Sequence, residues 1–112
     1  MDLENAISAL PNVGMTCVVA MPHPRWDERP VAIIQMAPGM STADAPTKEQ
    51  IDEHLLATED SRGLTFAKFQ LPDEILVWDT IPMTSTGKMS KKDAREQLLK
   101  AEYQLPSLRP KL

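Results

Sequence analysis

The chain has 112 residues, of which 42% are hydrophobic and 25% are charged. This length and composition are typical of one globular domain and exclude a disordered, highly charged chain. The formal net charge of −4 argues against non-specific binding to nucleic acid, which needs a basic surface. Because residues 1–79 carry a net −8 and residues 80–112 a net +4, an anionic ligand would prefer the C-terminal third.

The first half of the chain predicts a short helix followed by two strands. Apolar residues recur at the spacing of one helix face between residues 2 and 10, and Pro11 ends the pattern. Two apolar, β-branched runs at 16–21 and 31–36 are bounded by glycine or proline and predict buried strands. Cys17, the single cysteine, lies in the first run and is predicted to be a buried, reduced side chain.

A second helix is predicted after a connection rich in proline, glycine, serine and threonine. Thr47 and Gln50 have the spacing of a capping box, which predicts a helix over 48–57 with Ile51, Leu55 and Leu56 on its apolar face. A loop over 58–65 and one helical turn at 66–69 are expected to follow.

The last third predicts a strand and a helix. The strand is expected at 75–78, with Trp78 in the core. Ser90 is predicted to cap a helix that extends to about residue 104, with Asp93 as the reciprocal acid. The predicted inward face of this helix consists of Ala94, Leu98 and Ala101.

The order helix, strand, strand, helix, strand, helix predicts an α+β fold. Strands bury a face only where helices cover it, so we expect a small three-stranded sheet covered by helices, formed by residues 1–112 as one domain. The N-terminus is acidic where a secretory signal would be basic, and the apolar run at 17–21 is too short to cross a bilayer. These features predict a cytoplasmic protein without a membrane span.

The loop between the third strand and the last helix contains the strongest catalytic candidate. Pro82 ends the strand, hydroxyl side chains at 84–86 keep the loop polar, and Gly87 gives the backbone freedom to hold the next side chain outward. That side chain is Lys88, whose three donors suit the oxygens of a reacting carboxylate and phosphate. A P-loop is excluded, because that motif needs a glycine in place of Pro82 and a Ser or Thr in place of Met89.

Further charged and ligating side chains have simpler interpretations. Lys91 and Lys92 lie in the first turn of the last helix, where the helix dipole disfavours positive charge, so an anion is expected nearby. With Arg95 they would otherwise form a solvated helix face. His23 and His54 have no partners at metal-ligand spacing, and no metal site is predicted.

Four segments in order resemble one enzyme family. Residues 82–88, Pro-Met-Thr-Ser-Thr-Gly-Lys, resemble the P-x-T-x-T-G-K signature of the adenylate-forming enzymes, which include acyl-CoA synthetases, adenylation domains and luciferases. Residues 2–13 resemble the opening helix of their C-terminal cap domain, and residues 22–30 resemble its P-D/H-x-x-W-G-E-x-P connection. Residues 66–72 are similar to an aromatic segment of medium- and long-chain fatty acyl-CoA ligases.

The resemblance implies the mobile cap of an ATP-dependent fatty acyl-CoA ligase. In such enzymes a carboxylate attacks ATP, which is held with magnesium mainly by a large N-terminal domain, and CoA then displaces AMP from the acyl-adenylate. The cap rotates between the two steps, so it is expected to be inactive alone. Lys88 matches the lysine that stabilises charge at the α-phosphate, and Thr84, Thr86 and Gly87 belong to the same site.

The resemblance also implies that the opposite face meets CoA. Trp26 matches a position where some relatives stack an aromatic ring on the CoA adenine. An equally weighted alternative is that the Trp26 ring simply covers the edge of the sheet. Arg25, Lys68 and Phe69 are further candidates in this neighbourhood. The chain departs from the family pattern at Asp27, which replaces the usual glycine.

Two other functions stay open at this point. The cap of an adenylation domain that loads a carrier protein would share the Lys88 loop, although Trp26 favours CoA. A stand-alone interaction module could keep the fold without catalysis, although the intact Lys88 loop argues against it. The acyl chain length cannot be read, because the acyl pocket belongs to the large domain.

Overall fold

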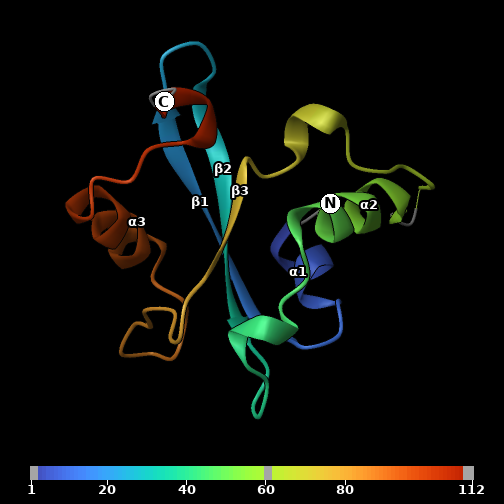
Figure 1. Cartoon of the computed structure of the whole chain (residues 1–112), viewed down its shortest axis with the longest axis horizontal. Helices are drawn as coiled ribbons and strands as arrows, with labels where there is room; N and C mark the ends of the chain where they lie inside the picture. The colour runs from blue at the N-terminus through green and yellow to red at the C-terminus, as the bar shows by residue number, and fades with distance from the viewer. Residues whose placement is uncertain (1–2, 60–61, 110–112) are drawn as a thin grey trace.

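A long antiparallel hairpin forms the frame of the fold (Figure 1). Strand β1, Val13–His23, pairs with strand β2, Asp27–Met36, so that Val19 lies opposite Val31. Both strands are longer than the apolar runs that predicted them, because backbone pairing continues through polar residues to the turn. In all, the computed structural model describes residues 3–59 and 62–109.

The third strand, β3, covers Glu74–Val77 and runs parallel to β2, which gives the sheet order β1-β2-β3. A parallel neighbour requires a long crossover, and this one contains helix α2, Lys48–Ala57, and a 3₁₀ turn at Lys68–Gln70. The strand begins one residue earlier than predicted. Trp78 follows it, half-buried against the core, as expected.

Helices cover both faces of the sheet, as Figure 1 shows. Helices α1, Leu3–Ser8, and α2 pack on one face, and helix α3, Lys91–Lys100, packs on the other. Strand β2 is central and is buried on both sides, so residues 31–34 are completely inaccessible. The predicted α+β fold, with a three-stranded sheet covered by helices, is confirmed. Each face of the sheet has its own hydrophobic core, and the two cores lie on opposite sides of β2. The core under α3 includes Cys17, Val19, Ile33, Ala94 and Leu98. The core under α1 and α2 includes Ile7, Ile34, Ile51, Leu55 and Phe66.

Capping decides where two of the helices begin. Helix α2 begins with the predicted capping box, in which Gln50 N–H donates to Thr47 Oγ1 (3.1 Å) and Thr47 N–H donates to Gln50 Oε1 (2.9 Å). Ser90 Oγ accepts from Asp93 N–H (3.2 Å), which confirms Ser90 as the cap of α3. The reciprocal bond predicted for Asp93 was wrong, because Ser90 N–H donates to the Pro82 carbonyl instead (2.8 Å).

The end of α3 corrects the sequence prediction. The helix stops at Lys100 rather than about residue 104, because Glu102 adopts a left-handed conformation with φ 55°. Tyr103 N–H donates to the Leu98 carbonyl (3.0 Å) and Glu102 N–H to the Leu99 carbonyl (3.1 Å), a Schellman ending. Glycine usually occupies this position, so glutamate gave no signal in the sequence. Ala101, predicted to face inward, is consequently exposed.

Smaller differences concern short elements. Helix α1 ends at Ser8 rather than at residue 10, and residue 2, predicted to begin it, lies outside the described residues. Leu56 was predicted on the buried face of α2 but is 38% exposed. The predicted loop at 58–65 includes residues 60–61, which also lie outside the described part. Two 3₁₀ turns, Thr42–Asp44 and Pro106–Leu108, were not predicted.

Candidate functional site

The Lys88 loop is a small closed hairpin between β3 and α3. Met83 pairs with Met89 in an isolated antiparallel bridge, and Thr84 N–H donates to the Lys88 carbonyl (2.6 Å). Gly87 N–H donates back to the Thr84 carbonyl (3.0 Å), with Gly87 at φ 85°. The left-handed conformation favours glycine, so Gly87 is the residue that lets the loop close.

The side-chain hydroxyl groups of Thr84 and Thr86 stabilise this hairpin. Thr84 Oγ1 lies 2.9 Å from Thr86 Oγ1 and accepts a hydrogen bond from Lys88 N–H (3.2 Å). The predicted site residues Thr84, Thr86, Gly87 and Lys88 therefore lie together, and the backbone of Lys88 is fixed at both its N–H and its carbonyl.

The Lys88 side chain is exposed at the end of this loop. Within residues 3–59 and 62–109, no carboxylate lies within ion-pair distance of its amine and no side chain accepts a hydrogen bond from it. Two cations of α3 are paired: Lys91 Nζ lies 3.2 Å from Glu4, and Arg95 lies 3.6 Å from Glu28. Glu4 is thus the anion that offsets the charge of Lys91 at the start of α3.

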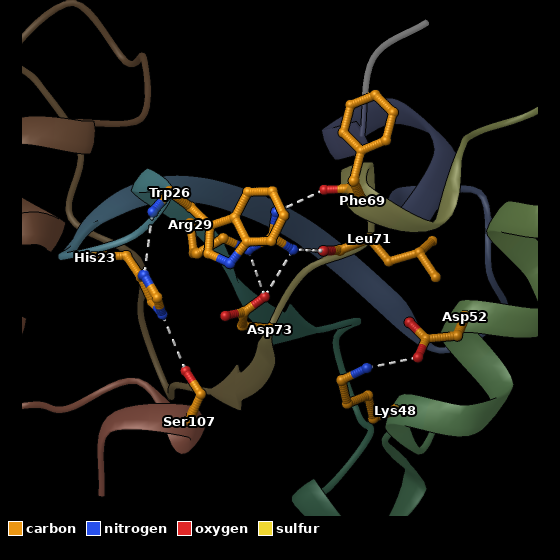
Figure 2. Close-up of polar contacts among 9 residues, drawn as sticks. All are labelled: His23, Trp26, Arg29, Lys48, Asp52, Phe69, Leu71, Asp73 and Ser107. Carbon is orange, nitrogen blue, oxygen red and sulfur yellow. Dashed lines mark hydrogen bonds and ion pairs between the residues drawn. The ribbon is translucent and has the colours of Figure 1, made fainter.

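A second candidate site lies beside the turn between β1 and β2 (Figure 2). An open pocket of about 470 Å³ is lined there by Arg25, Trp26 and Phe69, three of the residues that sequence analysis singled out. Trp26 is 58% exposed and Phe69 is 68% exposed, so neither ring is core packing. Lys68 is exposed but does not line the pocket.

The turn that carries Trp26 has a specific backbone requirement. Asp27 adopts φ 63°, in the left-handed region that favours glycine. His23 Nδ1 accepts hydrogen bonds from Arg25 N–H (3.0 Å) and Trp26 N–H (3.3 Å), and these bonds hold the turn. The Arg25 guanidinium lies 5.7 Å from the centre of the Trp26 ring, within cation-π range.

Arg29 organises the other wall of this pocket and was missed from the sequence. Its guanidinium donates to the carbonyls of Phe69 (2.7 Å) and Leu71 (3.0 Å) and to Asp73 Oδ1 (2.8 Å), as Figure 2 shows. An arginine near the start of a strand is ordinarily read as a solvated charge. Its partners lie 40 to 44 residues away along the chain, and no local pattern indicates them.

The two candidate sites lie at different ends of the domain. In Figure 1 the β1–β2 turn is at the top of the view, whereas the loop at 82–89 is at the lower left. In any single orientation of this domain, only one of the two sites, Lys88 or the Trp26 pocket, can therefore face the same place on another domain or ligand.

Other predicted features fall outside both sites. Cys17 is buried, and burial, followed by the Glu4 carboxylate, raises the pKa of its thiol above the ordinary value. Among the described residues, no group of three or more His, Cys, Asp or Glu side chains could hold a metal ion. None of the described helices is both long and apolar enough to cross a membrane.

The sequence of this chain matches a known domain family. The model for the AMP-binding enzyme C-terminal domain matches residues 2–88, which include the Lys88 loop and the Trp26 turn. The chain belongs to this family. The predicted resemblance to the cap of adenylate-forming acyl-CoA ligases is confirmed.

Several relatives of this domain are named as CoA ligases. The chain is 44% identical over 96 residues to a long-chain-fatty-acid–CoA ligase of Thermus thermophilus and 35% identical over 96 residues to a 3-methylmercaptopropionyl-CoA ligase of Ruegeria pomeroyi. Each match covers 86% of this chain and 16% of the relative. The chain thus spans about a sixth of the length of these curated relatives.

Solved structures agree with the fold. A fatty acyl CoA synthetase of Mycobacterium tuberculosis superposes with a TM-score of 0.68 at 26% identity, over 88% of this chain and 17% of that one. Apo MatB from Rhodopseudomonas palustris superposes equally well, with a TM-score of 0.68 at 26% identity, over 91% of this chain and 18% of that one.

Proposed function

We propose that residues 1–112 are the mobile C-terminal cap of an ATP-dependent fatty acyl-CoA ligase and are inactive without a large N-terminal domain. The relative named as a long-chain-fatty-acid–CoA ligase supports this substrate class. ATP and magnesium would be held mainly by the large domain. ATP, CoA and the reduced Cys17 are compatible with a cytoplasmic protein.

The observation that carries the proposal is the unpaired Lys88 amine on a fixed loop. In the adenylation step a carboxylate oxygen of the acid attacks the α-phosphate of ATP and pyrophosphate leaves. Negative charge develops on the oxygens between the two reactants, and a cation held there lowers the barrier. The Lys88 backbone is fixed by Thr84 while its side chain is exposed, so the amine is available to this charge.

The Trp26 pocket supports the second step. The CoA thiol displaces AMP from the acyl-adenylate, and the nucleotide end of CoA needs a surface of its own. Trp26 and Phe69 provide exposed aromatic faces for the adenine, while Arg25 and Lys68 provide positive charge. Because this pocket and Lys88 lie at different ends of the domain, a rotation between the two steps would let each serve one step.

The experiment uses a complete ligase in which this chain follows a large domain, such as that of the Thermus thermophilus relative. We expect Lys88→Ala to slow ATP–pyrophosphate exchange by a factor of about 10²–10³. Thioester formation from supplied acyl-adenylate should keep its rate, because the rotated cap would present the Trp26 pocket rather than Lys88 in that step.

Lys92→Ala is the matched control, because it removes an exposed lysine close by and should leave both steps unchanged. Equal losses in the two steps for Lys88→Ala would contradict the proposed role. A joined protein that forms no acyl-adenylate with the wild-type chain would contradict the proposed function itself.

A further inference from the structure

We propose that Arg29 is a positioning residue of the CoA site, which holds Phe69 at a set spacing from Trp26 so that a purine nucleotide fits between the two rings. This inference rests on the proposed function and deepens it. Arg29 acts through Phe69 and does not itself touch the ligand.

Each nitrogen of the Arg29 guanidinium has a partner within the protein. Nη1 donates to the Phe69 carbonyl, Nη2 donates to the Leu71 carbonyl, and Nε donates to Asp73 Oδ1, which Nη2 also approaches at 2.8 Å. The side chain is only 16% exposed. Each of the three nitrogens therefore has a protein partner, which fixes the orientation of the guanidinium and distinguishes Arg29 from the exposed Arg25.

Phe69 needs such support because its own side chain contacts little. The ring is 68% exposed and lies on a 3₁₀ turn of three residues, Lys68–Gln70. The chain is anchored in the core before this turn by Phe66 and after it by Pro72, both buried. Between those anchors, the bonds from Arg29 to the Phe69 and Leu71 carbonyls tie the turn to the sheet.

Trp26 is held from the same hairpin. It immediately precedes β2, which carries Arg29, and its N–H donates to His23 on β1. The two aromatic residues are 43 positions apart in the sequence, yet both line the same pocket (Figure 2). Arg29 is the side chain that couples their positions, because its guanidinium spreads donors over three nitrogens that reach separate acceptors.

The test measures KM for CoA and for pantetheine in the complete ligase. Pantetheine carries the reacting thiol but lacks the nucleotide, so it does not use the two rings. We expect Arg29→Lys to raise KM for CoA roughly fivefold, because a lysine keeps one charged contact but loses the fork. KM for pantetheine, kcat and ATP–pyrophosphate exchange should be unchanged, which also shows that the variant folds.

A double variant separates positioning from general support. In a Phe69→Ala background there is no ring to position, so Arg29→Lys should change KM for CoA by less than about twofold. Asp73→Asn removes a charge that orients the guanidinium while keeping the bonds to the carbonyls, and it should raise KM for CoA by a smaller factor. If Arg29→Lys does not fold, the KM for CoA of Asp73→Asn tests the positioning role instead.

The outcomes distinguish the two proposals. If Trp26→Ala and Phe69→Ala each raise KM for CoA but Arg29→Lys and Asp73→Asn do not, the positioning role is overturned and the CoA site stands. If Trp26→Ala and Phe69→Ala leave KM for CoA unchanged, the CoA site itself is wrong. Equal effects of Arg29→Lys on CoA and pantetheine would assign Arg29 a merely structural role.

Discussion

Glu4 on helix α1 satisfies the backbone of Val18 on the outer edge of the sheet. Its Oε2 atom accepts a hydrogen bond from Val18 N–H (2.8 Å), and its Oε1 atom lies 3.2 Å from Lys91 Nζ. Strand β1 is an edge strand with an unpaired side, and an edge N–H without a partner would cost stability or invite pairing with another chain. One carboxylate thus joins α1, β1 and α3.

Removing this carboxylate should destabilise the domain. We expect Glu4→Ala to lower the free energy of unfolding by about 1–3 kcal/mol, because Val18 N–H loses a charged acceptor. Glu4→Gln keeps an acceptor oxygen and should cost less than Glu4→Ala. Urea denaturation at pH 7 measures both, and an equal cost for the two variants would contradict the assignment of the loss to the Val18 bond.

The conformation of the turn before β2 predicts which residue types position 27 tolerates. Since Asp27 has φ 63°, Asp27→Val should lower the free energy of unfolding by roughly 1–2 kcal/mol, because a β-branched side chain is strained there. Asp27→Gly should be tolerated or slightly stabilising. Thermal unfolding compares the two, and if valine were tolerated as well as glycine, the turn geometry would be wrong.

The conformation of Gly87 leads to a prediction about the Lys88 loop. A Cβ added at Gly87 would meet no atom within 4 Å, so the cost of Gly87→Ala is conformational alone, roughly 1–2 kcal/mol at φ 85°. In the complete ligase the loop should open and ATP–pyrophosphate exchange should slow. Gly87→Asn, which tolerates this conformation better, should retain more activity. The opposite order, alanine above asparagine, would contradict the left-handed conformation.

Tyr103 predicts how stability changes at alkaline pH. Burial, followed by a hydrogen bond to Glu74 (2.6 Å), raises the pKa of Tyr103 above its ordinary 10.0. The folded protein therefore holds this proton more tightly than the unfolded chain. The stability it contributes is complete below pH 10 and is lost as the pH rises further.

Cys17, whose pKa burial raises from 9.0, contributes with the same sign from pH 9 upward. We expect the free energy of unfolding to fall between pH 9 and pH 11 in urea titrations. The fall above pH 10 should be shallower in Tyr103→Phe, and an unchanged slope would show that Tyr103 ionises equally in both states.

Local patterns were enough to predict most elements of this fold. The capping box at Thr47, the apolar runs of β1 and β2 and the glycine before Lys88 depend on neighbours within a few residues, so they can be read from the sequence. The Schellman ending at Glu102 escaped the prediction because a non-glycine residue took the left-handed conformation.

By itself, the sequence determined the order of the elements, the α+β class, the Lys88 loop and the family to which the chain belongs. Only the tertiary structure decided that helices cover both faces of the sheet, that Glu4 completes the edge at Val18 and that Arg29 holds Phe69. The reason is physical: periodicity, caps and turns arise from contacts between near neighbours. Partners tens of residues apart meet only after the chain has folded, and no pattern along the sequence encodes them.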